Sequence, residues 1–93
     1  MKRTSAGKLA KELNISRARG LEAVIKAQLI RAVLDAAKAQ GMTHGQISKN
    51  SGVPRSAVTG ILSGSLQKVT LDRVLKLVEA VNLTAEVRTK RAA

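Results

Sequence analysis

The 93-residue chain has room for one small domain and carries a formal net charge of +11, from 17 Lys and Arg against 6 Asp and Glu. It has no cysteine, which excludes disulfides and thiolate metal sites, and no Phe, Tyr or Trp, which argues against modules that stack single-stranded bases on rings. It contains neither the run of about 20 apolar residues of a membrane span nor the apolar stretch of a signal peptide, so we expect a cytoplasmic protein without membrane contact.

The excess positive charge lies in residues 1–19, 43–68 and 84–93, outside the segments predicted to form most of the core. Residues 43–68 contain basic residues and no acid. A polyanionic partner such as duplex DNA explains this distribution. Solubility, or RNA binding of the kind seen in ribosomal proteins, are the alternatives that charge alone leaves open.

Residues 1–19 are predicted to form a basic arm that is partly helical or mobile. Leu9 and Leu13 lie four residues apart and give one weak apolar stripe on a short helix. We expect residues 1–4 to be mobile and residues 5–19 to fold only against a partner.

Residues 21–40 predict the most regular helix, because they lack proline and are rich in Ala and Leu. Two apolar faces emerge when successive residues turn by about 100°. One face contains Leu21, Ile25, Leu29, Ala32 and Ala36, with Val33 on its flank, and the other contains Ala23, Ala27, Ile30, Leu34 and Ala37. One face suffices to pack on the domain. The second apolar face must be buried against a partner subunit or against the chain's own end, so Ile30 and Leu34 are candidate dimerisation residues.

Two short helices separated by a turn are predicted next. Thr43 is a suitable N-cap for a helix that reaches about Asn50. Gly52 stands where the turn needs a positive φ, and Pro54 fits the first turn of a second helix that ends near Leu62. The pair has a small apolar interior and a polar face, which is typical of a DNA-binding helix-turn-helix.

A fourth helix is predicted to begin after Thr70, its N-cap, and to end at Asn82. Its expected buried face consists of Leu71, Val74, Leu75, Leu77, Val78 and Val81. Residues 20–82 would then form the single domain.

Residues 83–93 predict a strand followed by a basic tail. Leu83, Ala85 and Val87 alternate with polar residues, which is the pattern of a half-buried strand. The chain shows no second strand signal, so the expected mate is the same strand of a second copy, paired antiparallel across a two-fold axis. The competing interpretation is an extended tail with accidental alternation.

The sequence offers no catalytic constellation. His44 is the single histidine, and no glycine-rich stretch has the form of a phosphate-binding loop. We therefore expect no enzyme activity, no cofactor and no metal site.

Residues 43–64, THGQISKNSGVPRSAVTGILSG, resemble the helix-turn-helix of the Cro/C1-type (XRE) family, and the added terminal strand resembles its short HigA-like antitoxin branch. The resemblance implies a mainly α, lambda-repressor-like domain of four to five helices, with a C-terminal β-strand that pairs across a dimer. The sequence departs from the family pattern at His44, Pro54 and Gly60.

Carried over by position, the resemblance implies that Arg55, Ser56 and Thr59 face the bases of the major groove. It also implies backbone phosphate contacts for a second set of residues, namely His44, Gln46, Ser63, Gln67 and Lys68. The predicted dimer contacts are Leu83, Ala85 and Val87 of the strand, with Ile30 and Leu34.

Three hypotheses about function follow. The first is a homodimeric, sequence-specific regulator that represses transcription from a palindromic operator in double-stranded DNA. The second is an antitoxin that also regulates its own operon and holds a toxin protein with its N-terminal segment or an outer helix face. The third is a non-specific architectural or RNA-binding basic protein.

Overall fold

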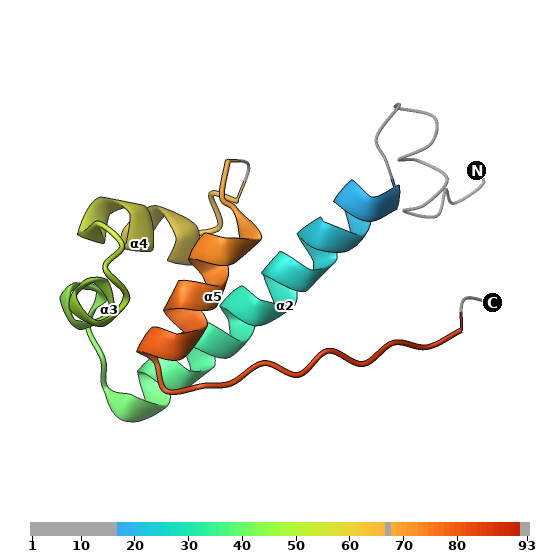
Figure 1. Cartoon of the computed structure of the whole chain (residues 1–93). Helices are drawn as coiled ribbons and strands as arrows, with labels where there is room; N and C mark the ends of the chain where they lie inside the picture. Colours follow the sequence, from blue (N-terminus) through green and yellow to red (C-terminus); the bar gives the residue numbers. More distant parts are fainter. Residues whose placement is uncertain (1–16, 67, 92–93) are drawn as a thin grey trace, which may run out of the picture.

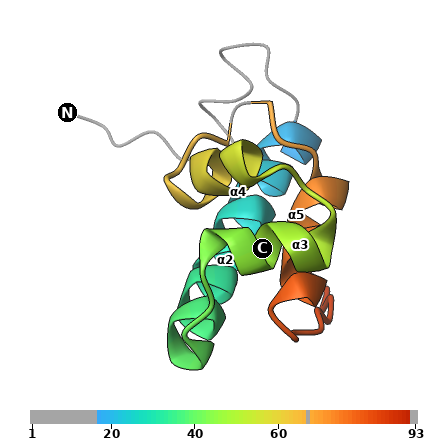
Figure 2. The same cartoon turned by 90° about the vertical axis from the view of Figure 1, so that its left-hand side faces the viewer.

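The computed structural model describes residues 17–66 and 68–91, and these residues contain four α-helices (Figure 1). The helices are α2 (Arg17–Gln40), α3 (His44–Ser51), α4 (Arg55–Leu62) and α5 (Leu71–Ala80). α2 and α5 pack against each other, and α3 and α4 lie across one end of that pair, in front of it when viewed from there (Figure 2). None of these helices is long and apolar enough to cross a membrane.

One aliphatic core joins all four helices. α2 contributes a stripe at i, i+3 and i+7, as expected for one helix face. α5 contributes several residues because its apolar face is broad. The buried residues are Ile30, Val33 and Ala37 of α2, Ile47, Val53, Val58 and Ile61 of the helix-turn-helix, and Val74, Leu77, Val78, Ala80 and Val81 of α5 and its end. The predicted mainly helical fold and the four helices predicted between residues 21 and 82 are therefore confirmed, whereas the short helix predicted around Leu9 and Leu13 lies outside the described residues.

The first half of α2 extends beyond this core (Figure 1). Leu21 is 62% exposed and Val24 is 49% exposed, although both are large apolar side chains. The Lys26 ammonium lies 3.0 Å from the Glu22 carboxylate one turn earlier, an ion pair between residues four apart on one helix face. This part of α2 is therefore a helix with apolar side chains that the described residues leave exposed.

The predicted division of α2 into two separate apolar faces is wrong. Ile30, assigned to an outer face, is only 5% exposed and lies in the core beside Val33, which was placed on the flank of the other face. Leu29 and Ala36 of the other predicted face also pack, partly buried, against this core, so the core-facing stripe of α2 takes residues from both predicted faces. Leu34 is 36% exposed and keeps an outward position.

The ends of α2 and α5 are tied together by two side chains. The Gln40 amide donates to the Val81 carbonyl oxygen at 2.7 Å, and the Asn82 amide donates to Gln40 Oε1 at 2.8 Å. Asn82 has a φ of 63°, and the Leu83 N–H donates to the Val78 carbonyl at 3.1 Å. These bonds turn the chain sharply away from α5.

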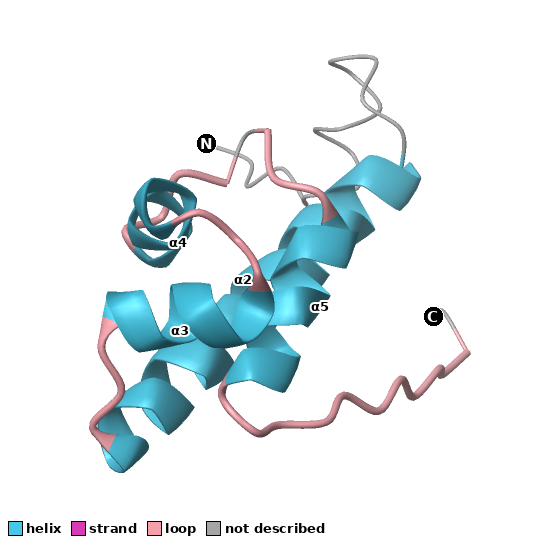
Figure 3. Cartoon of the chain, turned by 60° about the vertical axis from the view of Figure 1, so that its left-hand side comes forward, coloured by secondary structure: helices cyan, strands magenta, loops and turns pink. Residues whose placement is uncertain are grey.

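After this turn, residues 83–91 run as an extended segment, and no part of the described chain is assigned as β-strand (Figure 3). Val87 is 83% exposed. A strand is defined by backbone hydrogen bonds to a neighbouring strand, and the described residues of one copy provide no such neighbour for this segment. The strand therefore stays a prediction that concerns two copies.

The Gly52 backbone generates a testable prediction with Gly60 as its control. Gly52 has a φ of 74°, and a Cβ added to it would meet no atom within 4 Å, so Gly52→Ala introduces backbone strain without a clash. We expect a loss of about 1–2 kcal/mol in the free energy of unfolding, measured with urea. Gly60 lies inside α4 with the same open space, so Gly60→Ala should instead add about 0.5–1 kcal/mol. Equal shifts in the same direction would contradict this assignment of the turn.

Candidate nucleic-acid interface

The start of α3 is fixed by a capping box. Thr43 Oγ1 accepts a hydrogen bond from the Gln46 N–H at 3.2 Å, and the Thr43 N–H donates to Gln46 Oε1 at 2.8 Å. Two backbone donors at the helix N-terminus are satisfied in this way. The Gln46 oxygen is therefore engaged by the protein backbone, which leaves the side-chain NH₂ of this predicted phosphate contact for other partners.

The turn between α3 and α4 is held by its own side chains. Gly52 adopts the left-handed conformation, and its N–H donates to the Ser48 carbonyl at 2.9 Å. The Ser48 hydroxyl donates to the Val53 carbonyl at 2.6 Å, and the Val53 N–H donates to Ser51 Oγ at 3.1 Å. Val53 is consequently pinned in the core at 3% exposure. These bonds set the direction in which α4 leaves the turn.

α4 begins after Pro54, which is the N-cap with a ψ of 142° and makes no side-chain capping hydrogen bond, so it precedes the first helical turn in which it was predicted. Val58 and Ile61 point into the core, so the residues on the other side of the helix face outward. The three residues predicted to read bases are all exposed, namely Arg55, Ser56 and Thr59. The structure thus gathers them on one open surface of α4.

The first turn of α3 lies against this surface. His44 Nδ1 is 2.9 Å from Thr59 Oγ1, which joins a predicted phosphate contact to a predicted base contact. Arg55 Nη1 lies 4.0 Å from the position that a Cβ on Gly45 would take, so the guanidinium reaches back over the start of α3. The N-terminal turns of α3 and α4 therefore form one continuous polar surface.

The other predicted phosphate contacts are less closely grouped. The Ser63 hydroxyl donates to the Thr59 carbonyl at 2.6 Å, one turn back on α4. Lys68 is exposed in the loop between α4 and α5. Gln67 lies outside the described residues, so its predicted role is not placed by the structure.

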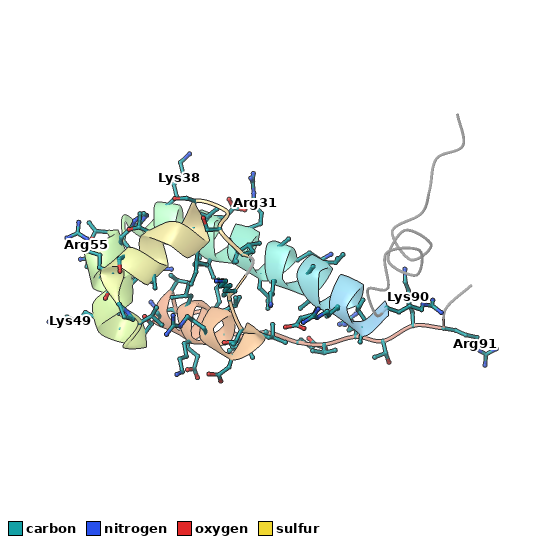
Figure 4. The ribbon with its side chains drawn as sticks, turned by 90° about the horizontal axis from the view of Figure 1, so that it is seen from above. Arg31, Lys38, Lys49, Arg55, Lys90 and Arg91 are labelled. Carbon is teal, nitrogen blue, oxygen red and sulfur yellow. The ribbon has the colours of Figure 1, made fainter. Side chains whose placement is uncertain are left out.

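The charge around this surface is positive. Lys49 and Arg55 extend from α3 and α4 at one end of the molecule, and Lys38 is at the nearby end of α2 (Figure 4). Neither α3 nor α4 contains an acid. In the described part of the chain, the ion pairs involve acids on α2, on α5 and in the C-terminal segment, and none includes Lys49 or Arg55. These cations are thus oriented toward solvent, as required to meet an anion.

Sequence reasoning missed two features of this surface. The capping role of Gln46 has a local signal, since Thr-x-x-Gln before a helix is a known capping pattern. The hydrogen bond between His44 and Thr59 joins residues 15 positions apart, and no local sequence pattern predicts it. Within the described residues, no group of three or more His, Asp or Glu side chains is arranged to hold a metal ion.

Comparison with known proteins supports the same assignment. A family model described as a helix-turn-helix domain matches residues 9–90. No curated protein and no solved structure gives a significant match to the chain.

Proposed function

Because the chain belongs to the helix-turn-helix domain family, we propose that it is a sequence-specific regulator of transcription that acts as a homodimeric repressor on a palindromic DNA site. The observation that carries the proposal is the exposed face of α4. Arg55, Ser56 and Thr59 are grouped there in a cationic setting without carboxylates on α3 or α4. A protein that reads duplex DNA needs such a surface on an element narrow enough for the major groove.

Each residue of this surface has a role that its chemistry allows. The Arg55 guanidinium suits guanine, since its paired donors match the O6 and N7 acceptors. Ser56 can donate to or accept from a base or a phosphate, and the Thr59 methyl group can contact a thymine methyl. Gly60 lets the DNA approach α4 closely. His44 contacts Thr59, and Gln46, Ser63 and Lys68 are exposed on α3, at the end of α4 and in the loop after it; we expect these four to contact phosphates, which position the protein without reading sequence.

The homodimer is proposed from the segment that follows α5. Its extended backbone and exposed Val87 are suited to antiparallel pairing with the same segment of a second copy, which would align Leu83, Ala85 and Val87 on one face. Leu34 remains exposed and available for a contact, whereas the burial of Ile30 removes it from the proposed interface. A two-fold dimer would place the two α4 helices in successive major grooves, about 34 Å apart.

Competition binding tests the proposed specificity. A site selected from random duplex DNA should be preferred over unrelated duplex DNA by about 1,000-fold or more. Arg55→Ala should then weaken binding to the selected site by about 1–3 kcal/mol and relax the base preference at one position.

Arg31→Ala is the matched control for the loss of one positive charge. Arg31 is exposed on α2, outside the helix-turn-helix, and pairs with Asp35 at 3.6 Å. Its removal should leave the base preference unchanged. Equal affinity of the unmodified protein for selected and unrelated DNA would favour the non-specific architectural alternative, and an unchanged preference ratio in Arg55→Ala would refute the role given to Arg55.

Val87→Glu tests the proposed dimer. Two copies of this carboxylate would face each other near the two-fold axis, where like charges repel and lose solvent. We expect the protein to sediment as a monomer and to lose binding to the full palindrome while it still binds a half-site weakly. Leu75→Glu serves as the control, because Leu75 is an apolar side chain of α5 that is 40% exposed. If Leu75→Glu sediments as a monomer while Val87→Glu remains a dimer, the proposed interface is wrong and the dimer forms through α5.

A second candidate function, an antitoxin that also represses its own operon, is favoured by the projecting half of α2. Leu21 and Val24 are large apolar side chains that are exposed there. The double substitution Leu21→Glu and Val24→Glu should abolish binding to the product of a small neighbouring reading frame, measured by calorimetry, and leave DNA binding intact. Binding that survives this change would refute the assignment of α2 as the toxin-holding surface.

A further inference from the structure

Two opposite charges lie side by side on the extended segment after α5. Arg88 Nε lies 3.4 Å from Glu86 Oε1, and both side chains are exposed. Residues two apart on an extended backbone share one face, and the residue between them belongs to the other face. The segment therefore presents an ordered pair of opposite charges on one face, and the exposed Val87 belongs to the other.

The backbone near the end of α5 sets where pairing with a second copy can begin. The Leu83 N–H donates to the Val78 carbonyl oxygen at 3.1 Å. The Leu83 side chain also packs, partly buried, against the core. Because Leu83 is already engaged by its own domain, an antiparallel ladder between two copies begins no earlier than Thr84.

We infer that the two copies of the homodimer pair in one register, with Val87 on the two-fold axis and Glu86 of each copy opposite Arg88 of the other. The inference rests on the proposed function, because it concerns the homodimer proposed there. It assigns Glu86 and Arg88 as the residues by which one copy of the chain recognises another.

Symmetry leaves few registers to compare. Directly opposed residues of an antiparallel pair lie on the same face, and side chains alternate along a strand, so one residue must oppose its own counterpart on the axis. With Val87 on the axis, a ladder that begins at Thr84 extends to Lys90. With Ala85 on the axis, a ladder that begins at Thr84 already ends at Glu86 and makes fewer backbone hydrogen bonds.

Charge disfavours the registers on either side of the inferred one. Glu86 on the axis would oppose Glu86 of the second copy, and Arg88 on the axis would oppose Arg88 of the second copy. Like charges directly opposite each other destabilise a strand pair. With Val87 on the axis, each Glu86 has Arg88 of its own chain beside it and Arg88 of the second copy opposite. The charges then alternate in sign around the axis, so neighbours attract both along and across the strands.

Charge reversal in the full chain tests the register. Glu86→Arg and Arg88→Glu each convert both opposed pairs into like charges, so each should raise the dimer dissociation constant about tenfold or more, measured by sedimentation. Lys90→Glu is the matched control for Arg88→Glu, because it makes the same change in net charge on the same face. Lys90 opposes the uncharged Thr84 in the inferred register, so this control should change the constant by less than about threefold.

Mixing experiments then identify the opposed pairs. Equal amounts of Glu86→Arg and Arg88→Glu should form heterodimers, because every opposed pair again joins opposite charges. The double variant Glu86→Arg with Arg88→Glu keeps the net charge and should form its own homodimer. An affinity-tagged copy of this double variant should retain about tenfold less unmodified chain than double variant, since the mixed pair opposes like charges. Both positions are exposed outside the core, and urea unfolding curves check that each variant is folded.

The outcomes separate this inference from the proposed homodimer. Dimers of unchanged affinity in both single reversals overturn the register, and so does free exchange between the double variant and the unmodified chain. A larger loss in Lys90→Glu than in Arg88→Glu also overturns it, because Arg88 would then lie on the axis with Lys90 opposite Glu86. If the unmodified protein sediments as a monomer at the highest concentration tested, the proposed homodimer itself is wrong.

Discussion

The turn between α3 and α4 is the constraint on which the exposed surface depends. Gly52 takes a left-handed conformation with a φ of 74°, and the Ser48 hydroxyl bonds to the Val53 carbonyl at 2.6 Å. With the turn set, Ile47 and Val58 meet in the core and the opposite side of α4 is left open. The same geometry brings the first residue of α3 to within hydrogen-bonding distance of Thr59. A change in the crossing of these two helices would therefore alter packing and surface chemistry together.

The core that supports this turn is small and consists of aliphatic residues. Aliphatic side chains bury apolar area without polar atoms that need partners, and the described residues bury no polar or charged side chain. Truncation of any one of these side chains is therefore expected to lower the free energy of unfolding, since a domain of this size buries little apolar area in total. The hydrogen bonds from Gln40 and Asn82 add a fixed connection between α2 and α5 at the end where the extended segment departs.

Local sequence signals were enough to predict most of the fold. Thr43 and Thr70 are caps for α3 and α5, and Gly52 marks the turn, because each role depends only on neighbouring residues. The exposure of Arg55, Ser56 and Thr59 also follows from helical periodicity once Val58 and Ile61 are taken as buried.

Features that depend on tertiary packing could not be predicted from the sequence. Ile30 belongs to one of the two predicted apolar faces of α2, and only the packing of the other helices decides that it is buried while Leu34 of the same face is exposed. The pairing of His44 with Thr59 depends on how α3 meets α4, and residues so far apart in sequence leave no periodic signal. Leu83, Ala85 and Val87 alternate with polar residues as in a strand, but the strand that we propose as their hydrogen-bonding partner belongs to a second copy of the chain.

The arrangement of the helices separates the cations of α3 and α4 from the exposed apolar side chains of α2 and of the C-terminal segment. Lys49 and Arg55 lie at one end of the molecule, and Lys90 and Arg91 lie at the opposite end (Figure 4). The exposed Leu21 and Val24 belong to the half of α2 that extends away from the core, and Val87 to the segment beyond α5. α2 connects the two regions as one continuous helix, with its second half in the core and its first half outside. The exposed apolar side chains on the outer half of α2 are therefore separated from the exposed α4 surface by the length of one helix.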